Sequence, residues 1–185
     1  MDVLKTEIDG VLVIVPRIFE DPRGFFMESF HRRRYEEAAV GADFCQGNIS
    51  FSCRNTLRGL HYQFPNEQAK LVQVLMGEIF DVAVDVRRGS PTFGRWVAVT
   101  LSDRNRRQMF IPKGFAHGFC VLSERALFSY KCSDFYSPEC DRGVLWSDSS
   151  LGIEWPVDVP LLSTKDERLP ILKEIPPEHL PEYKE

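Results

Sequence analysis

Two of the four histidines in this sequence have neighbours that suit proton transfer. His61 lies in the segment Leu57–Gln63 and His117 in the segment Pro112–Phe119, both within strand-like sequence. A histidine titrates near neutral pH, so it can take up and release a proton at a reacting carbon. By spacing alone, either side chain is more often structural than catalytic. The other two histidines lie beside a run of arginines and in a proline-rich tail, and are not candidates.

The segment that ends at His117 resembles the second conserved motif of the cupins, P-x-G-x-x-H. The first cupin motif supplies metal ligands as H-x-H followed by Glu. Here the matching stretch is His61-Tyr62-Gln63, which contains no second histidine. A transition-metal site with three or four ligands cannot be assembled from these positions. We therefore predict a barrel without metal or cofactor, whose chemistry comes from side chains.

Length and charge narrow the class of protein. The chain has 185 residues, 43% of them hydrophobic, and a formal net charge of −4. This predicts one globular domain, residues 1–185 with a core at about 10–170, and disfavours a nucleic-acid partner. No P-loop, G-x-G-x-x-G, signal peptide or apolar run long enough for a membrane is present. Five cysteines without C-x-x-C predict free thiols in the cytoplasm.

The pattern from residue 45 onward predicts mostly short strands. In residues 79–86, Phe80, Val82 and Val84 alternate with Asp81, Ala83 and Asp85, so the two sets occupy opposite faces. Further strands are expected at 10–15, 25–30, 70–75, 96–101, 109–111, 119–122 and 126–132, with one helix at 32–40. Together these predict an all-β, antiparallel sandwich or barrel with few short helices. The resemblance to the cupins implies that it is a jelly-roll barrel. Residues 151–185 are expected to form an irregular tail on the domain, with a helical turn near 164–167.

An ordered set of motifs resembles the dTDP-4-dehydrorhamnose 3,5-epimerase family. The motifs are residues 21–28, 46–48, 57–63, 70–72, 77–85, 90–94, 111–119, 130–132, 152–156 and 163–166. One such motif is weak evidence, whereas ten in consistent order are strong. The resemblance implies a metal-free cupin enzyme that inverts the carbons flanking the C4 ketone of a dTDP-linked 6-deoxy sugar.

Each inversion needs a base on one face of the sugar, an acid on the other, and a cation or donor at the enolate oxygen. The resemblance assigns His61 as the base, paired with Asp166, and Tyr130 as the proton donor on the opposite face. It assigns Lys70 to the enolate oxygen. Without the resemblance, Asp166 would be interpreted as a surface acid or helix cap, and Tyr130 as a core aromatic.

The resemblance also implies how the nucleotide is held. Guanidinium groups suit a diphosphate, because they offer paired donors. The expected substrate-binding residues are Arg23 and Arg58 at the diphosphate, Glu28, Gln46 and Asn48 at the deoxythymidine, Phe19 and Tyr136 as stacking or pocket walls, His117 in the sugar pocket, Asp81 beside the lysine, and Lys165.

Arg58 and His61 differ in strand parity. With regular pleating they would face opposite sides of the sheet. Both can face one pocket only if Gly59 permits a bulge or bend. The sequence therefore predicts an irregular strand at this position.

The resemblance further implies a homodimer, in which N-terminal strands at residues 10–30 pair with the partner's sheet and complete its nucleotide site.

Asn55 and Asp141 stand where relatives often carry Gly and Glu, which leaves open whether both carbons are inverted. The alternatives are an epimerase acting only at C3 or C5, a related ketoisomerase, a non-catalytic nucleotide-sugar-binding cupin and a metal-dependent cupin oxygenase. The combined presence of a base, an acid and a lysine argues against mere binding.

Overall fold

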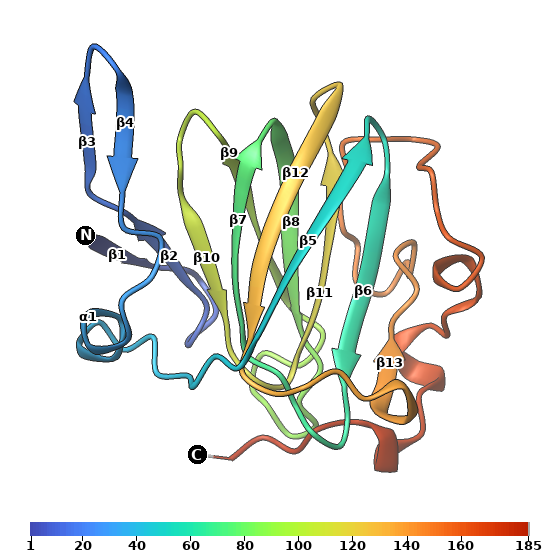
Figure 1. Cartoon of the computed structure of the whole chain (residues 1–185). Helices are drawn as coiled ribbons and strands as arrows, with labels where there is room; N and C mark the ends of the chain where they lie inside the picture. The colour runs from blue at the N-terminus through green and yellow to red at the C-terminus, as the bar shows by residue number, and fades with distance from the viewer. Residues whose placement is uncertain (185) are drawn as a thin grey trace.

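Two antiparallel sheets face each other and enclose the main core (Figure 1). The structure is a computed structural model that describes residues 1–184. In spatial order, the first sheet contains β1 (Asp2–Lys5), β2 (Leu12–Val15), β10 (Gln108–Ile111), β7 (Lys70–Met76), β12 (Arg125–Cys132) and β5 (Gln46–Cys53). The second contains β13 (Asp141–Gly143), β6 (Leu57–Gln63), β11 (Phe115–Val121), β8 (Glu78–Asp85) and β9 (Trp96–Ser102). The predicted all-β jelly-roll class is confirmed; the strand ranges expected from the sequence had not included β1, β5, β6 or β13.

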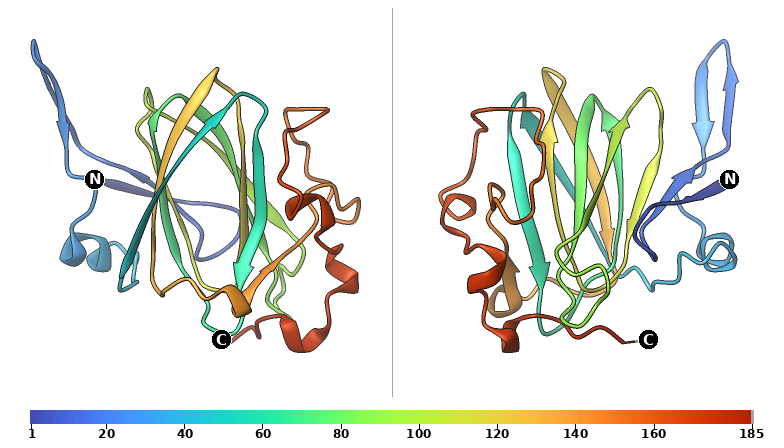
Figure 2. Two further views of the ribbon diagram at one scale, coloured as in Figure 1. Left: turned by 45° about the vertical axis from the view of Figure 1, so that its right-hand side comes forward. Right: turned by 180° about the vertical axis from the view of Figure 1, so that it is seen from behind.

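Strand β8 shows why the second sheet is buried on both faces. Ala83 lies in the core cluster between the sheets, and Asp81 is fully buried on the same face. Val82 and Val84 lie on the other face, where residues of the C-terminal segment such as Leu172 cover them. The alternation predicted for 79–86 is therefore confirmed. The same covering places the C-terminal segment beside β6 (Figure 2).

The outer face of the first sheet is partly covered by α1 (Arg32–Glu37). Tyr35 packs there against Leu71 and Phe110 in a third buried cluster. The predicted helix begins at the expected residue but ends before 40, because Ala39 adopts a positive φ of 63°. Such a left-handed residue terminates helical hydrogen bonding.

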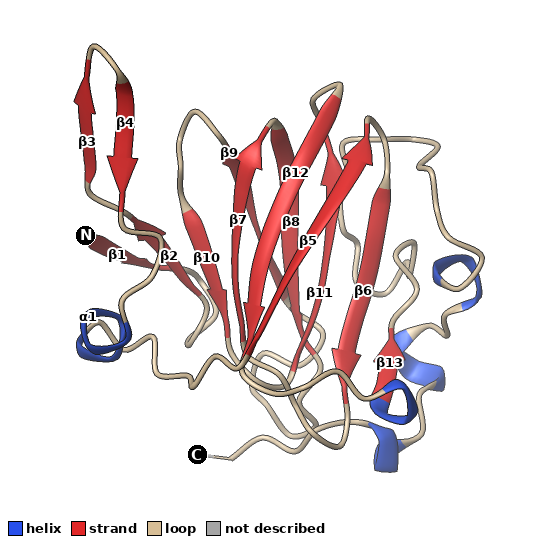
Figure 3. Ribbon diagram, in the orientation of Figure 1, coloured by secondary structure: helices blue, strands red, loops and turns tan. Residues whose placement is uncertain are grey.

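The C-terminal region is irregular, as the proline-rich sequence predicts (Figure 3). Single 3₁₀ turns occur at Pro138–Cys140, Asp166–Arg168, Leu172–Glu174 and Pro177–His179. The turn predicted near 164–167 thus lies about two residues later. No helix in residues 1–184 is long and apolar enough to cross a membrane.

A separate hairpin, β3 (Ile18–Asp21) and β4 (Gly24–Met27), projects away from the barrel in both views (Figures 1 and 2). The strand predicted at 25–30 is shorter than expected and belongs to this hairpin. Near its turn, where Glu20 pairs with Phe25, the Arg106 guanidinium lies 3.9 Å from the ring centre of Phe25 and forms an ion pair with Glu20. The loop between β9 and β10 thus contacts the hairpin near its tip, although most hairpin side chains are exposed.

Candidate active site

A cavity between the two sheets collects the residues expected to carry the chemistry. It has two adjoining parts of about 380 and 240 Å³, and both are lined by His61, Lys70, Tyr130 and Lys165. Gln46 and Asn48 line the larger part. A cavity of this size with converging polar groups is a typical small-molecule site.

An irregularity in β6 decides which side chains face this cavity. His61 pairs with His117 and Arg58 with Phe119, so three steps along β6 match two along β11. Gly59 absorbs the extra residue with a φ of +119°. A Cβ atom there would lie 2.5 Å from the Cα atom of Gly118. Both Arg58 and His61 consequently line the smaller part of the cavity, which confirms the predicted bulge.

His61 and Asp166 form a close pair although 105 residues separate them. The distance from His61 Nε2 to Asp166 Oδ1 is 2.5 Å, and Asp166 is 3% exposed. Burial raises the pKa of Asp166, but hydrogen bonds from His61, Ser163 and the Gly59 amide outweigh it and leave that pKa below its usual value. The ionised carboxylate accepts the Nε2 proton and leaves Nδ1 as the basic nitrogen.

Tyr130 lies across the cavity from His61, on the first sheet. It pairs with Asn48 on one side and Val72 on the other. Burial raises the pKa of Tyr130, with Cys132 adding to the shift and Arg58 opposing it. The phenol therefore stays protonated at neutral pH and can donate a proton.

Lys70 is a buried cation at the start of β7. Its Nζ donates a hydrogen bond to the carbonyl oxygen of His61 at 3.3 Å. Burial lowers the pKa of Lys70, while Cys132 and Asp81 oppose the shift. An ammonium held in such a place can stabilise negative charge that develops on a nearby oxygen.

A second histidine–carboxylate pair lies behind the lysine. His117 Nε2 is 3.0 Å from both oxygens of Asp81, and its ring stacks on Phe128. Burial raises the pKa of Asp81 and lowers the pKa of His117. This favours one proton shared within the pair over two separated charges. The charge of Asp81 also acts on Lys70, in agreement with its predicted place beside the lysine.

Polar groups converge at the mouth of the cavity. The Gln46 Oε1 atom accepts the Tyr136 amide proton at 2.8 Å, and its Nε2 donates to Asn48 Oδ1 at 3.1 Å. Arg58 donates to the Ser52 hydroxyl at 3.1 Å. Lys165 forms an ion pair with Asp141. These side chains provide cations and amides where a charged ligand would enter.

Comparison with known proteins identifies the chain. The profile of dTDP-4-dehydrorhamnose 3,5-epimerase matches residues 5–174. The chain belongs to this family. A dTDP-4-dehydrorhamnose 3,5-epimerase from Shigella flexneri is 59% identical, over 90% of this chain and 93% of the relative. The structure also resembles that of the dTDP-6-deoxy-D-glucose-3,5-epimerase from Legionella pneumophila in complex with dTDP-4-keto-L-rhamnose, with a TM-score of 0.97, 51% identity and coverage of 100% and 99% of the two chains.

The predicted reaction class is thereby confirmed: the chain is an isomerase of the dTDP-4-dehydrorhamnose 3,5-epimerase type. One relative with a narrower name is also similar. A dTDP-4-dehydrorhamnose 3-epimerase from Streptomyces niveus is 41% identical, over 90% of this chain and 82% of the relative. The sequence similarity therefore also extends to a relative named for inversion at one carbon.

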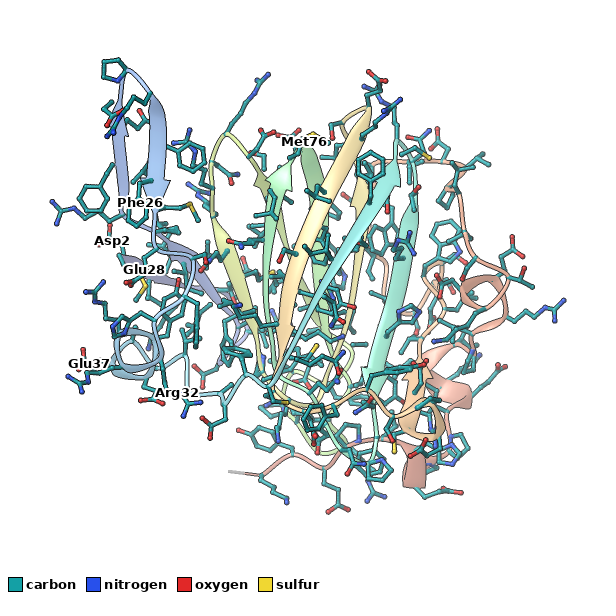
Figure 4. The ribbon with its side chains drawn as sticks, viewed as in Figure 1. Asp2, Phe26, Glu28, Arg32, Glu37 and Met76 are labelled. Carbon is teal, nitrogen blue, oxygen red and sulfur yellow. The ribbon has the colours of Figure 1, made fainter. Side chains whose placement is uncertain are left out.

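Three residues expected at the epimerase nucleotide site lie away from the cavity of their own chain. Phe19 and Arg23 are on the projecting hairpin, and Arg23 pairs with its neighbour Asp21 at 2.6 Å. Glu28 follows the hairpin and pairs with Arg34 at 2.7 Å (Figure 4). Their role in nucleotide binding stays a prediction that needs a second chain.

Several cavity residues were not expected from the sequence. Cys132 and Gln63 line the larger part, the Ser163 hydroxyl oxygen accepts a hydrogen bond from the Asp166 amide at 3.1 Å, and Asp141 joins Lys165 at the mouth. Cys132 and Ser163 belong to motifs that carried the family resemblance, so their place in those motifs was a usable signal. Within residues 1–184, no group of three or more His, Cys, Asp or Glu is arranged to hold a metal ion.

Proposed function

We propose that this cavity inverts C3 and C5 of dTDP-4-dehydro-6-deoxy-D-glucose to give dTDP-4-dehydro-L-rhamnose, with His61 as the base. The observation that carries this assignment is the close contact of His61 with a buried, ionised Asp166, opposite Tyr130 in one cavity. A base and an acid on facing walls are what inversion at carbon requires.

The proposed step begins with the proton on the carbon next to the C4 ketone. His61 takes that proton as the C–H bond breaks, and Asp166 stabilises the imidazolium. The electron pair moves to the ketone oxygen, where Lys70 stabilises the enolate. Tyr130 then gives its hydroxyl proton to the opposite face of the carbon. Solvent restores both protonation states, so solvent hydrogen enters the product.

The diphosphate of the substrate is assigned to the cations nearest the mouth. Arg58 and Lys165 both line the smaller part of the cavity and both are partly exposed. The deoxythymidine end is assigned to Gln46, Asn48 and Tyr136, which line the larger part. His117 and Asp81 shape the inner end, beside Lys70.

We further propose a homodimer in which residues 10–30 pair with the partner's sheet and bring Phe19, Arg23 and Glu28 to its cavity. The hairpin carries exposed aromatic rings, with Phe26 at 69% exposure. Strand β5 is an edge of the first sheet, and its Ile49 is 67% exposed. An open edge with apolar side chains is a surface that proteins usually cover. Sedimentation analysis tests this directly: a monomer at micromolar concentration would contradict it.

Isotope exchange tests the proposed reaction. The enzyme is incubated with dTDP-4-keto-6-deoxyglucose in deuterated water, and the sugar is examined by NMR. Deuterium at both C3 and C5 is expected. Label at a single carbon would instead support a C3- or C5-only epimerase, the alternative favoured by the 3-epimerase relative. No label at either carbon would contradict the proposal.

We also propose that the chain acts as one domain and in the cytoplasm. The clusters on the two faces of the second sheet are built on shared strands, which supports a single folding unit. All five cysteines are free thiols in the structure, which suits a reducing compartment.

A further inference from the structure

Asp141 occupies a junction at the mouth of the cavity. Its Oδ2 atom accepts the hydroxyl proton of Tyr136 at 2.9 Å and is also the ion-pair partner of Lys165 Nζ. All three residues line the larger part of the cavity. One carboxylate oxygen thus connects the ammonium of Lys165 and the phenol of Tyr136, and both side chains line the cavity.

The two partners of this ion pair are held differently. Asp141 begins β13 and pairs with Gln63 on β6, so its backbone is fixed by the sheet that carries His61. Lys165 comes from the irregular segment before the 3₁₀ turn Asp166–Arg168, and its side chain is 49% exposed, against 16% for Asp141. The lysine is therefore the partner that can move.

A diphosphate entering the cavity would compete with Asp141 for this lysine. Lys165 lines both parts of the cavity and lies with Arg58 around the smaller one. A diphosphate offers more negative charge than one carboxylate, and an ammonium can turn toward it by rotating its flexible stem. An uncharged nucleoside offers no such exchange.

We propose that Asp141 is a positioning residue, which holds Lys165 in the free enzyme and yields it to the substrate diphosphate. The inference rests on the proposed function, because it takes the diphosphate as the ligand of the mouth. Asp141 does not touch the reacting carbons. It affects ligand binding through Lys165. It favours ligands whose negative charge can replace the Asp141 carboxylate as the partner of this lysine.

Calorimetric titration with dTDP and with thymidine tests the proposal. Asp141→Asn keeps an acceptor for Tyr136 but removes the charge that holds Lys165. We expect dTDP to bind about two- to fivefold more tightly, the range of a partly exposed ion pair. Thymidine binding should not change. Asp141→Glu, the residue that relatives often carry, should restore the wild-type affinity for dTDP.

A double-mutant cycle separates the ion pair from a general field effect. In a Lys165→Met background, Asp141→Asn should leave dTDP affinity unchanged. Glu139 provides a matched control: it is an exposed acid near Tyr136 whose carboxylate accepts a hydrogen bond from the Ser137 hydroxyl, and Glu139→Gln should not alter dTDP binding. Tightening that persists without Lys165, or no tightening in Asp141→Asn, would overturn the proposal. Failure of the wild type to bind dTDP would instead contradict the proposed function itself.

Discussion

The cavity and the β3–β4 hairpin differ in how far their side chains are enclosed by this chain. In the cavity, each histidine has its carboxylate within the same chain: His61 contacts Asp166, and His117 contacts Asp81. On the hairpin, Phe26 is exposed and the side chain of Arg23 is 89% exposed. A lone two-stranded ribbon gains little stability in water. Under the proposed function and homodimer, the chemistry is complete in one chain, whereas nucleotide capture also uses the hairpin of a second.

The largest effect is expected on the cavity side. His61→Ala removes the base, so deuterium exchange at C3 and C5 should fall by about 10²- to 10⁴-fold. Affinity for dTDP, measured by calorimetry, should stay within a few-fold because the hairpin and the mouth are intact. Exchange at the wild-type rate would show that His61 is not the base. It would also contradict the proposed division between catalysis in the cavity and nucleotide capture by the hairpin.

Gly59 tests whether backbone shape is part of the site. A Cβ atom at this position would lie 2.5 Å from Gly118 Cα and 2.7 Å from the His117 carbonyl oxygen. Gly59→Ala should therefore displace His61 and lower the exchange rate by about 100-fold, since small misplacements have costs of that order. It should also reduce stability by about 1–3 kcal/mol in urea denaturation.

The matched control for this substitution is Gly41→Ala, because a Cβ atom there meets nothing within 4 Å. It should retain activity and stability. Equal behaviour of the two alanine variants would show that the close approach of Gly59 to Gly118 does not position the site.

Arg23 tests the hairpin side of the comparison. Arg23→Ala should raise KM about tenfold, the cost of losing one charge-assisted hydrogen bond, and leave kcat near the wild-type value. Arg33→Ala, another exposed arginine, is the control and should change neither constant. A fall in kcat with unchanged KM would place Arg23 in the chemistry rather than in binding.

The smallest effect is a shift in the pH profile of kcat. Lys70 must be charged to stabilise the enolate, and burial lowers its pKa, so activity should decline as pH rises through that lowered pKa. Asp81 opposes the shift. Asp81→Asn should therefore lower the pKa of Lys70 further and move the alkaline decline to lower pH. If the alkaline decline of kcat instead stayed at the same pH or moved to higher pH, the electrostatic effect of Asp81 on Lys70 would be disproved.

Much of the barrel could be predicted because its signals are local. The alternation in 79–86 reflects a pleat with a period of two, and it correctly assigned Asp81 and Val82 to opposite faces. The end of α1 was missed because Ala39 adopts a positive φ, and an alanine in the sequence does not indicate that conformation. Strand β1 was missed because its residues are mostly exposed and depend on pairing with β2.

By itself, the sequence determined the motifs, and their family resemblance predicted a base at His61, an acid at Tyr130, a cation at Lys70 and a carboxylate at Asp166. It also determined that Arg58 and His61 could share a face only through a bulge. Tertiary structure alone decided that Asp166 crosses 105 positions to reach His61, and that Asp141 meets Lys165. Side-chain periodicity is encoded over a few residues, whereas contacts between distant segments exist only once the C-terminal tail has packed on the second sheet.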